Sequence, residues 1–203
     1  MNLILASSSP RRRDLLTLAG LLFAVHPSDE SERTPRRHEP AQTYVRELSQ
    51  GKARSVAKHY PGDIVLAADT VVTVDGDILG KPASPVEARS MLVLLRGRTN
   101  VVATGITLLF RELEFQSVVT AQVAMRPYQD EDIDEYIRTG EPLDKAGAYA
   151  VQGIGGQLVA CTRGCYTAIV GLPLCMTMRL LHEVGTAQRV VDFGWCAYCG
   201  QKP

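Results

Sequence analysis

Three hydroxyl groups and three arginines surround one proline in the stretch ASSSPRRRDLL, residues 6–16, which follows a short apolar run. That run predicts a buried strand over 3–6, and Ser9 followed by Pro10 is typical of the start of a helix, here over 10–18. A helix N-terminus has unpaired backbone N–H groups and the positive end of the helix dipole, so arginines in this turn oppose the dipole. An anion bound at this corner would stabilise them.

Arg12 is the arginine that most needs a partner. Three residues define the apolar face of the predicted helix: Leu15, Leu16 and Ala19. At about 100° per residue, Arg12 lies near the middle of that face, where an unpaired charge is very costly. Either Arg12, Arg11 and the hydroxyls of Ser7 and Ser9 bind an anion, or Arg12 pairs with a structural carboxylate and the other arginines are solvated.

Two more charged residues occupy apolar positions. Lys52 falls in line with the apolar stripe of a helix predicted over 41–60, so it either points inward as another cation or extends to solvent. Asp69 ends the apolar run 64–68, which predicts a strand covered on both faces. A carboxylate there is costly unless it is paired or binds a metal, so Asp69 is either a base or metal ligand, or a buried structural aspartate.

A tight hairpin connects Asp69 to a further lysine. Asp75-Gly76 between valine-rich flanks predicts a two-residue turn, and counting outward from it pairs Thr70 with Lys81. Lys81 would then lie beside Asp69. A carboxylate next to a lysine stays ionised at neutral pH and could ligate Mg²⁺ or orient a water, although a simple ion pair is the alternative.

A glycine-rich stretch over 146–156 includes Gln152, whose amide could read a base edge, and its glycines allow close approach to a ligand.

The remaining elements alternate irregularly between strand and helix. The irregular order of strands and helices predicts a mixed, twisted sheet. The further strands are predicted over 21–26, 101–110, 114–125, 157–162 and 165–170, and the further helices over 85–95, 130–138 and 172–184.

Composition narrows the class of protein. The 203 residues are 45% hydrophobic with zero formal net charge, which suits one globular domain and does not favour nucleic acid or an anionic membrane as partner. The chain has no apolar run of about 20 residues, no signal-like N-terminus and an odd number of cysteines, so we expect a cytoplasmic protein. The absence of a GxxxxGK[ST] stretch argues against a P-loop kinase.

Taken together, these stretches resemble the Maf family of nucleoside triphosphate pyrophosphatases. The resemblance implies a mixed α/β fold over 1–185, with a twisted sheet in two lobes around a cleft, similar to inosine triphosphate pyrophosphatases. It also implies a divalent metal, Mg²⁺ with Mn²⁺ or Co²⁺ as substitutes, and a homodimer is common in the family. The matching stretches are LILASSSPRRRDLL at 3–16, Glu30 in SDES, GKA at 51–53, AADTVV at 67–72, GKP at 80–82, DKAGAYAVQG at 144–153 and VGLPL at 170–174.

The family motifs assign roles residue by residue. By resemblance, Asp69 is the proton acceptor, Glu30 is a metal or water partner, Asp69 and Glu30 are the metal ligands, and Lys81 assists catalysis. Arg11, Thr70 and Gln152 match positions tied to base choice. The phosphate-binding set is Ser7, Ser9, Arg11, Arg12, Lys52 and Lys81.

The ADT and DKAGAYAVQG motifs resemble the branch that hydrolyses dTTP and UTP to the monophosphate and pyrophosphate. The alternatives are the 7-methyl-GTP branch and a nucleotide-binding regulator of septum formation without turnover. Residues 186–203 form a tail of unknown role. Its Cys196 and Cys199 could be half of a zinc site completed by His182 or a second chain, a redox pair, or solvated residues.

Overall fold

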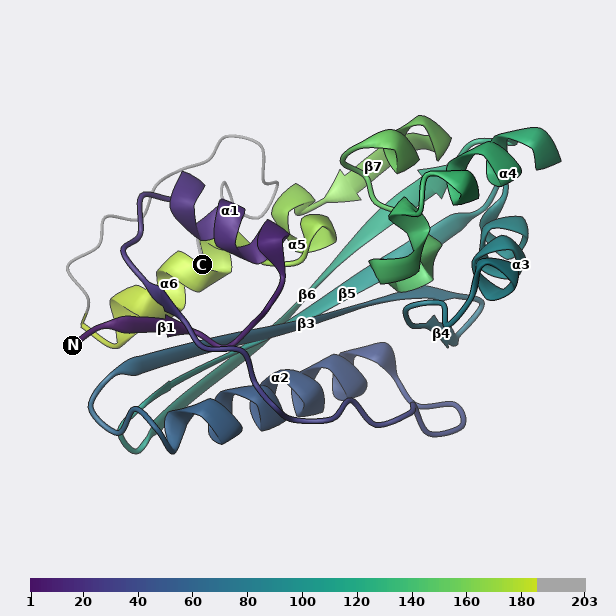
Figure 1. The fold of residues 1–203 in the computed structure, drawn as a ribbon. Coiled ribbons are helices and arrows are strands. Elements are labelled where there is room, and N and C mark those ends of the chain that lie inside the picture. Colours follow the sequence, from purple (N-terminus) through teal and green to yellow (C-terminus); the bar gives the residue numbers. More distant parts are fainter. Residues whose placement is uncertain (186–203) are drawn as a thin grey trace.

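The computed structural model describes residues 1–185, so the predictions for the tail, including Cys196 and Cys199, lie outside the described residues. Within 1–185 the chain forms one twisted sheet with helices on both faces (Figure 1). The strands are β1 (Leu3–Leu5), β2 (Ala24–Val25), β3 (Ile64–Val74), β4 (Asp77–Leu79), β5 (Thr99–Phe110), β6 (Leu113–Met125) and β7 (Val159–Gly164). The α-helices are α1 (Pro10–Leu18), α2 (Ala41–Ala57), α3 (Pro85–Leu95), α4 (Asp130–Arg138), α5 (Tyr166–Val170) and α6 (Leu174–Glu183).

The sheet mixes parallel and antiparallel neighbours. Its strand order is β2-β1-β3-β5-β6-β7, and β4 pairs with the far end of β3. β1 is parallel to both β2 and β3, whereas β3, β5, β6 and β7 pair antiparallel in turn. This arrangement confirms the predicted mixed α/β class. None of the described helices is both long enough and apolar enough to cross a membrane.

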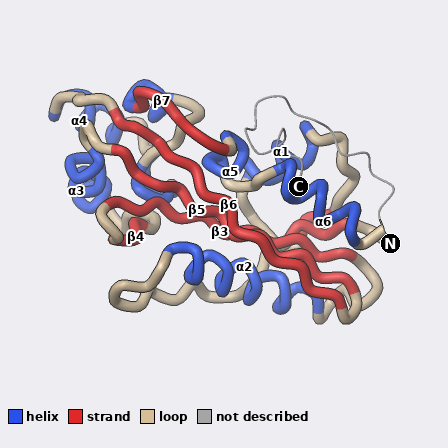
Figure 2. Tube along the Cα trace, turned by 180° about the vertical axis from the view of Figure 1, so that it is seen from behind, coloured by secondary structure: helices blue, strands red, loops and turns tan. Residues whose placement is uncertain are grey.

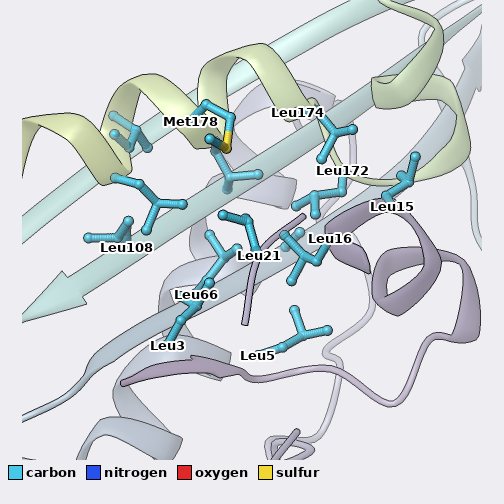
Figure 3. Packing of buried hydrophobic residues seen from close by; sticks show 14 of the residues in the cluster. Leu3, Leu5, Leu15, Leu16, Leu21, Leu66, Leu108, Leu172, Leu174 and Met178 are labelled. Atoms are coloured by element: carbon cyan, nitrogen blue, oxygen red, sulfur yellow. The ribbon is translucent and has the colours of Figure 1, made fainter. Parts of the chain in front are cut away.

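Long strands connect two hydrophobic cores on one face of the sheet. β3, β5 and β6 run side by side along the molecule, with α1, α5 and α6 over one half and α3 and α4 at the other end (Figures 1 and 2). The first core packs β1, α1 and α6 against the early part of β3 (Figure 3). The second packs α3 and α4 against the later part of β3. These two cores form the two lobes.

The alternation of side chains along β3 shows where the lobes meet. Ile64, Leu66 and Ala68 belong to the first core, and Val72 and Val74 belong to the second. The odd-numbered residues of β3 lie on the opposite face, which α2 covers. They too are apolar toward both ends of the strand, with one buried carboxylate between them. The even-numbered residue between the two cores is Thr70, and the carboxylate facing α2 is Asp69.

The Asp75-Gly76 hairpin is confirmed, but its outer pairing is wrong. Both turn residues have positive φ, 53° and 90°, as a two-residue turn of type I′ requires. Val74 pairs with Asp77 and Val72 with Leu79, but β4 ends there, so the predicted pair of Thr70 with Lys81 is not part of the ladder. The chain leaves β3 because the carbonyl of Gly80 accepts a hydrogen bond from the N–H of Gly147 at 2.9 Å.

The predicted strand over 165–170 is also wrong, because this segment forms helix α5. The N–H groups of Ala168 and Ile169 donate to the carbonyl of Cys165, and the hydroxyl of Thr167 accepts from the N–H of Leu174. Thr167 to Val170 are all buried, so every side of the segment is apolar or satisfied. A short helix buried on all sides has the same apolar run as a buried strand, and periodicity cannot separate them.

Candidate active site

A cavity opens where one edge of β3 has no neighbouring strand. β1 pairs with β3 as far as Leu66 and β4 pairs from Val72 onward, while β5 covers the other edge from Val65 to Thr73. Among the described strands, none pairs with residues 67–71 on the open edge. The cavity there has a volume of about 940 Å³. It lies beside the carboxyl end of β1, where ligands bind in open α/β sheets.

All ten site residues predicted from the sequence line this one cavity. They come from the turn between β1 and α1, α1 itself, the segment before α2, α2, β3, the segment after β4 and the glycine-rich stretch. The structure therefore brings together Ser7, Ser9, Arg11, Arg12, Glu30, Lys52, Asp69, Thr70, Lys81 and Gln152. Their chemical roles stay predictions.

The guanidinium of Arg12 is held by neutral oxygens. Its Nε donates to the carbonyl of Gly171 at 2.9 Å, and its two terminal nitrogens donate to Ser7 Oγ at 3.0 Å and Thr70 Oγ1 at 3.3 Å. Burial lowers the pKa of Arg12, although the charge of Asp69 acts against this. No carboxylate of the described residues forms an ion pair with Arg12, so the alternative of a structural salt bridge is wrong.

Lys52, rather than Lys81, lies against Asp69. Lys52 Nζ donates to Asp69 Oδ1 at 2.5 Å and to Glu32 Oε1 at 2.6 Å. Asp69 is 5% exposed, and the lysine side chain is 12% exposed. Burial raises the pKa of Asp69 above its ordinary value, although the charges of Lys52 and Arg12 act against this rise. A carboxyl group with a raised pKa is a better proton acceptor near neutral pH.

Glu32 is a site residue that the sequence reasoning missed. For Glu32, burial acts to raise the pKa, but the hydrogen bond and charge of Lys52, together with Lys81 and Arg12, outweigh burial and lower it. Glu30 also lines the cavity, yet its carboxylate lies over Gly51, where an added Cβ would be 3.4 Å from Glu30 Cγ. Two glutamates at alternate positions of an irregular segment carry no periodic signal that distinguishes one from the other.

The glycine-rich stretch is built differently from the prediction. Gly147 has φ 67° and approaches Val72, since an added Cβ would lie 2.9 Å from the valine Cβ. Gly155 approaches the hydroxyl of Tyr136 in the same manner, and its N–H donates to Glu141. These glycines therefore allow the chain to pack on the protein rather than on a ligand.

Lys145 is a second residue that the sequence reasoning missed. Its side chain is mostly buried, lines the cavity and forms an ion pair with Asp144. It lies two residues before Gly147, whose N–H donates to the carbonyl of Gly80, so it adds a cation on the same side of the cavity as Lys81. The DKAG motif contained Lys145, but adjacent opposite charges at the surface are common and gave no separate signal.

The carboxylates of the cavity fit a metal that is held jointly with a substrate. Asp69 and Glu32 approach each other through Lys52 Nζ, and Glu30 lies nearby along the same segment. Among residues 1–185, no group of three or more His, Cys, Asp or Glu side chains is arranged to hold a metal. Mg²⁺ is usually bound by one or two carboxylates together with substrate phosphates, which matches this donor set.

A family model described as Maf-like protein matches residues 2–184. The chain belongs to the Maf family. The matched residues include every described element from β1 to α6 and all of the cavity residues. Each Maf-like stretch of the sequence contributes at least one residue to the cavity, so motifs that are far apart along the chain converge in the fold.

Curated relatives of this Maf chain have one activity in their names. The dTTP/UTP pyrophosphatase of Thermomicrobium roseum is 48% identical over 185 residues, which cover 91% of this chain and 85% of that protein. The dTTP/UTP pyrophosphatase of Symbiobacterium thermophilum is 45% identical over 183 residues, covering 90% and 94%.

A search of solved structures found the nucleoside-triphosphatase, or dITP/XTP pyrophosphatase, of Mycobacterium abscessus. It is 16% identical, with a TM-score of 0.42, over 63% of this chain and 76% of that one. A likeness at this TM-score says nothing about activity.

Proposed function

We propose that this Maf chain hydrolyses nucleoside triphosphates to the monophosphate and pyrophosphate, with dTTP and UTP as its preferred substrates. The observation that carries the proposal is the convergence of Arg12, Lys52, Lys81 and the buried Asp69 on one cavity of about 940 Å³. The names of the relatives support the reaction and the two substrates.

The corner between β1 and α1 would bind the phosphates. Arg12 is already oriented by Gly171, Ser7 and Thr70, so little conformational freedom is lost when it binds an anion. Ser9 is the N-cap residue of α1, but its side chain makes no capping hydrogen bond, which leaves the hydroxyl available. The dipole of α1 and the cations around the cavity would stabilise negative charge that develops on the phosphates.

Asp69 would accept a proton from the water that attacks the α-phosphorus, and pyrophosphate would leave. Its buried position raises its pKa, and Lys52 holds one carboxylate oxygen in place. Glu32 would help to position the same lysine. In phosphoryl transfer, catalysis is mostly positioning and electrostatic stabilisation, which is what this arrangement supplies.

Asp69 and Glu32 would hold a divalent metal, Mg²⁺ or in its place Mn²⁺ or Co²⁺, together with phosphate oxygens. Such an ion neutralises charge on the phosphates. Glu30, the metal ligand predicted from the motif, lines the same cavity and stays a second candidate.

Arg11, Thr70 and Gln152 would contact or border the base. Thr70 Oγ1 already accepts from Arg12 and lies 2.9 Å from Thr104 Oγ1. Thr70 would therefore lie between the residues that bind the phosphates and those that border the base. Distinguishing thymine from uracil requires sensing one methyl group, worth only about 1–3 kcal/mol, so both should be accepted. A cytoplasmic location would suit a reaction on free nucleotides, and homodimerisation stays a prediction from the family resemblance.

A panel of triphosphates with Mg²⁺ tests the proposal: dTTP, UTP, CTP, GTP and 7-methyl-GTP, scored for monophosphate and pyrophosphate. We expect dTTP and UTP to be the fastest. Faster turnover of GTP or 7-methyl-GTP than of UTP would contradict the base assignment. Binding of nucleotide without release of pyrophosphate would favour a regulatory protein instead.

A further inference from the structure

One wall of the cavity is a segment without helix or strand, residues 28–40, that lies between β2 and α2. Ser28, Glu30, Glu32 and Arg33 all line the cavity from this segment. An irregular segment of this length loses much conformational entropy when it is ordered, so specific contacts must hold it. The side-chain hydrogen bonds that these residues make within the described protein go either to α2 or to other residues of the same segment.

Arg33 and Glu39 form the strongest of these contacts. Arg33 Nη1 donates to Glu39 Oε2 at 2.8 Å and Nη2 donates to Glu39 Oε1 at 2.5 Å, which is a two-pronged charge-assisted pair. Nη2 also donates to Glu47 Oε2 at 2.5 Å, and the guanidinium lies 4.8 Å from the ring centroid of Tyr44. The side chain of Glu39 is only 4% exposed and also accepts from the N–H of Arg36.

The backbone of Arg33 is fixed as well. Tyr44 Oη donates to the carbonyl of Arg33 at 2.5 Å. Arg33 is therefore fixed at its guanidinium, by Glu39 and Glu47, and at its carbonyl, by Tyr44. It follows Glu32 directly in the chain. α2 also carries Lys52, two turns beyond Tyr44, so the helix provides the anchor of the segment and the lysine that Glu32 contacts.

The contact of Glu32 with Lys52 could not hold the segment alone. The Glu32 side chain is 48% exposed, and ion pairs with an exposed partner contribute little because solvent screens them. The position of Glu32 therefore depends on what anchors its neighbour. Glu39 does not line the cavity, so it can affect substrate only through the segment that it anchors.

We propose that the Arg33–Glu39 pair is a positioning device that holds Glu32 against Lys52 at the reaction site. This inference rests on the proposed function for its effect on catalysis. Its structural part, the ordering of residues 29–35, can be measured without any substrate.

The kinetic test compares two glutamate-to-glutamine variants. Glu39→Gln removes the charge of the anchoring pair, whereas Glu114→Gln removes a more exposed ion pair between Glu114 of β6 and Arg54 of α2, neither of which lines the cavity. We expect Glu39→Gln to lower kcat about tenfold with KM changed less than about twofold, since a small misplacement of an active-site group is costly. Glu114→Gln should match the wild type.

A double-mutant cycle separates positioning from general loss of structure. In a Glu32→Gln background, Glu39→Gln should lower kcat by less than about twofold, because the group that it positions is already gone. An equal fold-change in both backgrounds would overturn the inference and indicate a structural role that does not act through Glu32. Wild-type kcat in Glu39→Gln would overturn it too.

Hydrogen exchange gives a readout that does not need turnover. The amides of residues 29–34 should exchange at least about fivefold faster in Glu39→Gln than in the wild type or Glu114→Gln. Unchanged exchange would overturn the ordering role. If the wild type released no pyrophosphate from any triphosphate, the proposed function would fail, while the exchange rates would still decide whether the pair orders the segment.

Discussion

Two walls of the same cavity present their carboxylates in different ways. Asp69 extends from β3, whose backbone pairs with β5 both before and after this residue. Its side chain is buried against α2. Glu32 extends from an irregular segment, is half exposed and depends on side-chain contacts for its position. The pairing of β3 with β5 fixes the backbone that carries Asp69, whereas a few ion pairs hold Glu32. The difference predicts unequal sensitivity to mutation.

The largest expected effect comes from the strand side of the cavity. Asp69→Asn keeps the size of the side chain and removes the proposed proton acceptor, so the rate should fall by about 10²–10⁴-fold. The thermal unfolding midpoint should change little, because the amide can still accept from Lys52. The measurements are pyrophosphate release with UTP and a thermal melt; a variant that keeps most of the wild-type rate removes Asp69 from its proposed role.

A smaller effect is expected for the irregular segment 28–40. It shows which of its two glutamates, Glu30 or Glu32, contributes more to catalysis. Glu32→Gln should lower kcat by about tenfold, because it removes a carboxylate proposed to position Lys52 and to hold the metal, and misplacement of an active-site group is costly. Glu30→Gln should lower it by less than about threefold, because the structure places that carboxylate over Gly51. Steady-state kinetics on the two variants makes the comparison, and a larger loss in Glu30→Gln would restore the assignment made from the motif.

The smallest expected effect is the loss, at acid pH, of the stability that the Arg33–Glu39 pair contributes. The hydrogen bond from Arg33 lowers the pKa of Glu39 from 4.5 to about 2, so the folded state favours the ionised form. The stability that this pair contributes is present above pH 4.5 and is lost as the pH falls toward about 2. Urea unfolding of the wild type and Glu39→Gln should therefore give a difference that shrinks over this range. A difference that stays constant from pH 7 to pH 2.5 would contradict the role of the pair.

Features set by neighbouring residues were predictable from the sequence. The predicted helix over 85–95 is α3, where Ser84 accepts from the N–H of Glu87, and α1 begins at Pro10 as predicted. The turn at Asp75-Gly76 set the inner pairs of its hairpin, because few residue types tolerate two successive positive φ angles. Each of these predictions depends on a contact within about four residues.

Features that depend on distant contacts were predicted less well. The outer pair of the hairpin is absent because Gly80 bonds to Gly147, which is 67 residues away. Helix α5 was predicted as a strand because its burial on all sides comes from other elements. The sequence put Lys52 in line with the apolar stripe of α2 but left open whether it points inward, and its partners Asp69 and Glu32 could not be identified without the packing of α2 on β3.

The sequence by itself determined which residue types are out of place: Arg12, Lys52 and Asp69 at apolar positions need charged or polar partners wherever they lie. It also determined the family, since the motifs occur in order along the chain. Only the tertiary structure decided which groups meet. The partners depend on the open edge of β3, between the end of β1 and the start of β4, and that edge exists only after strands far apart in the chain have paired.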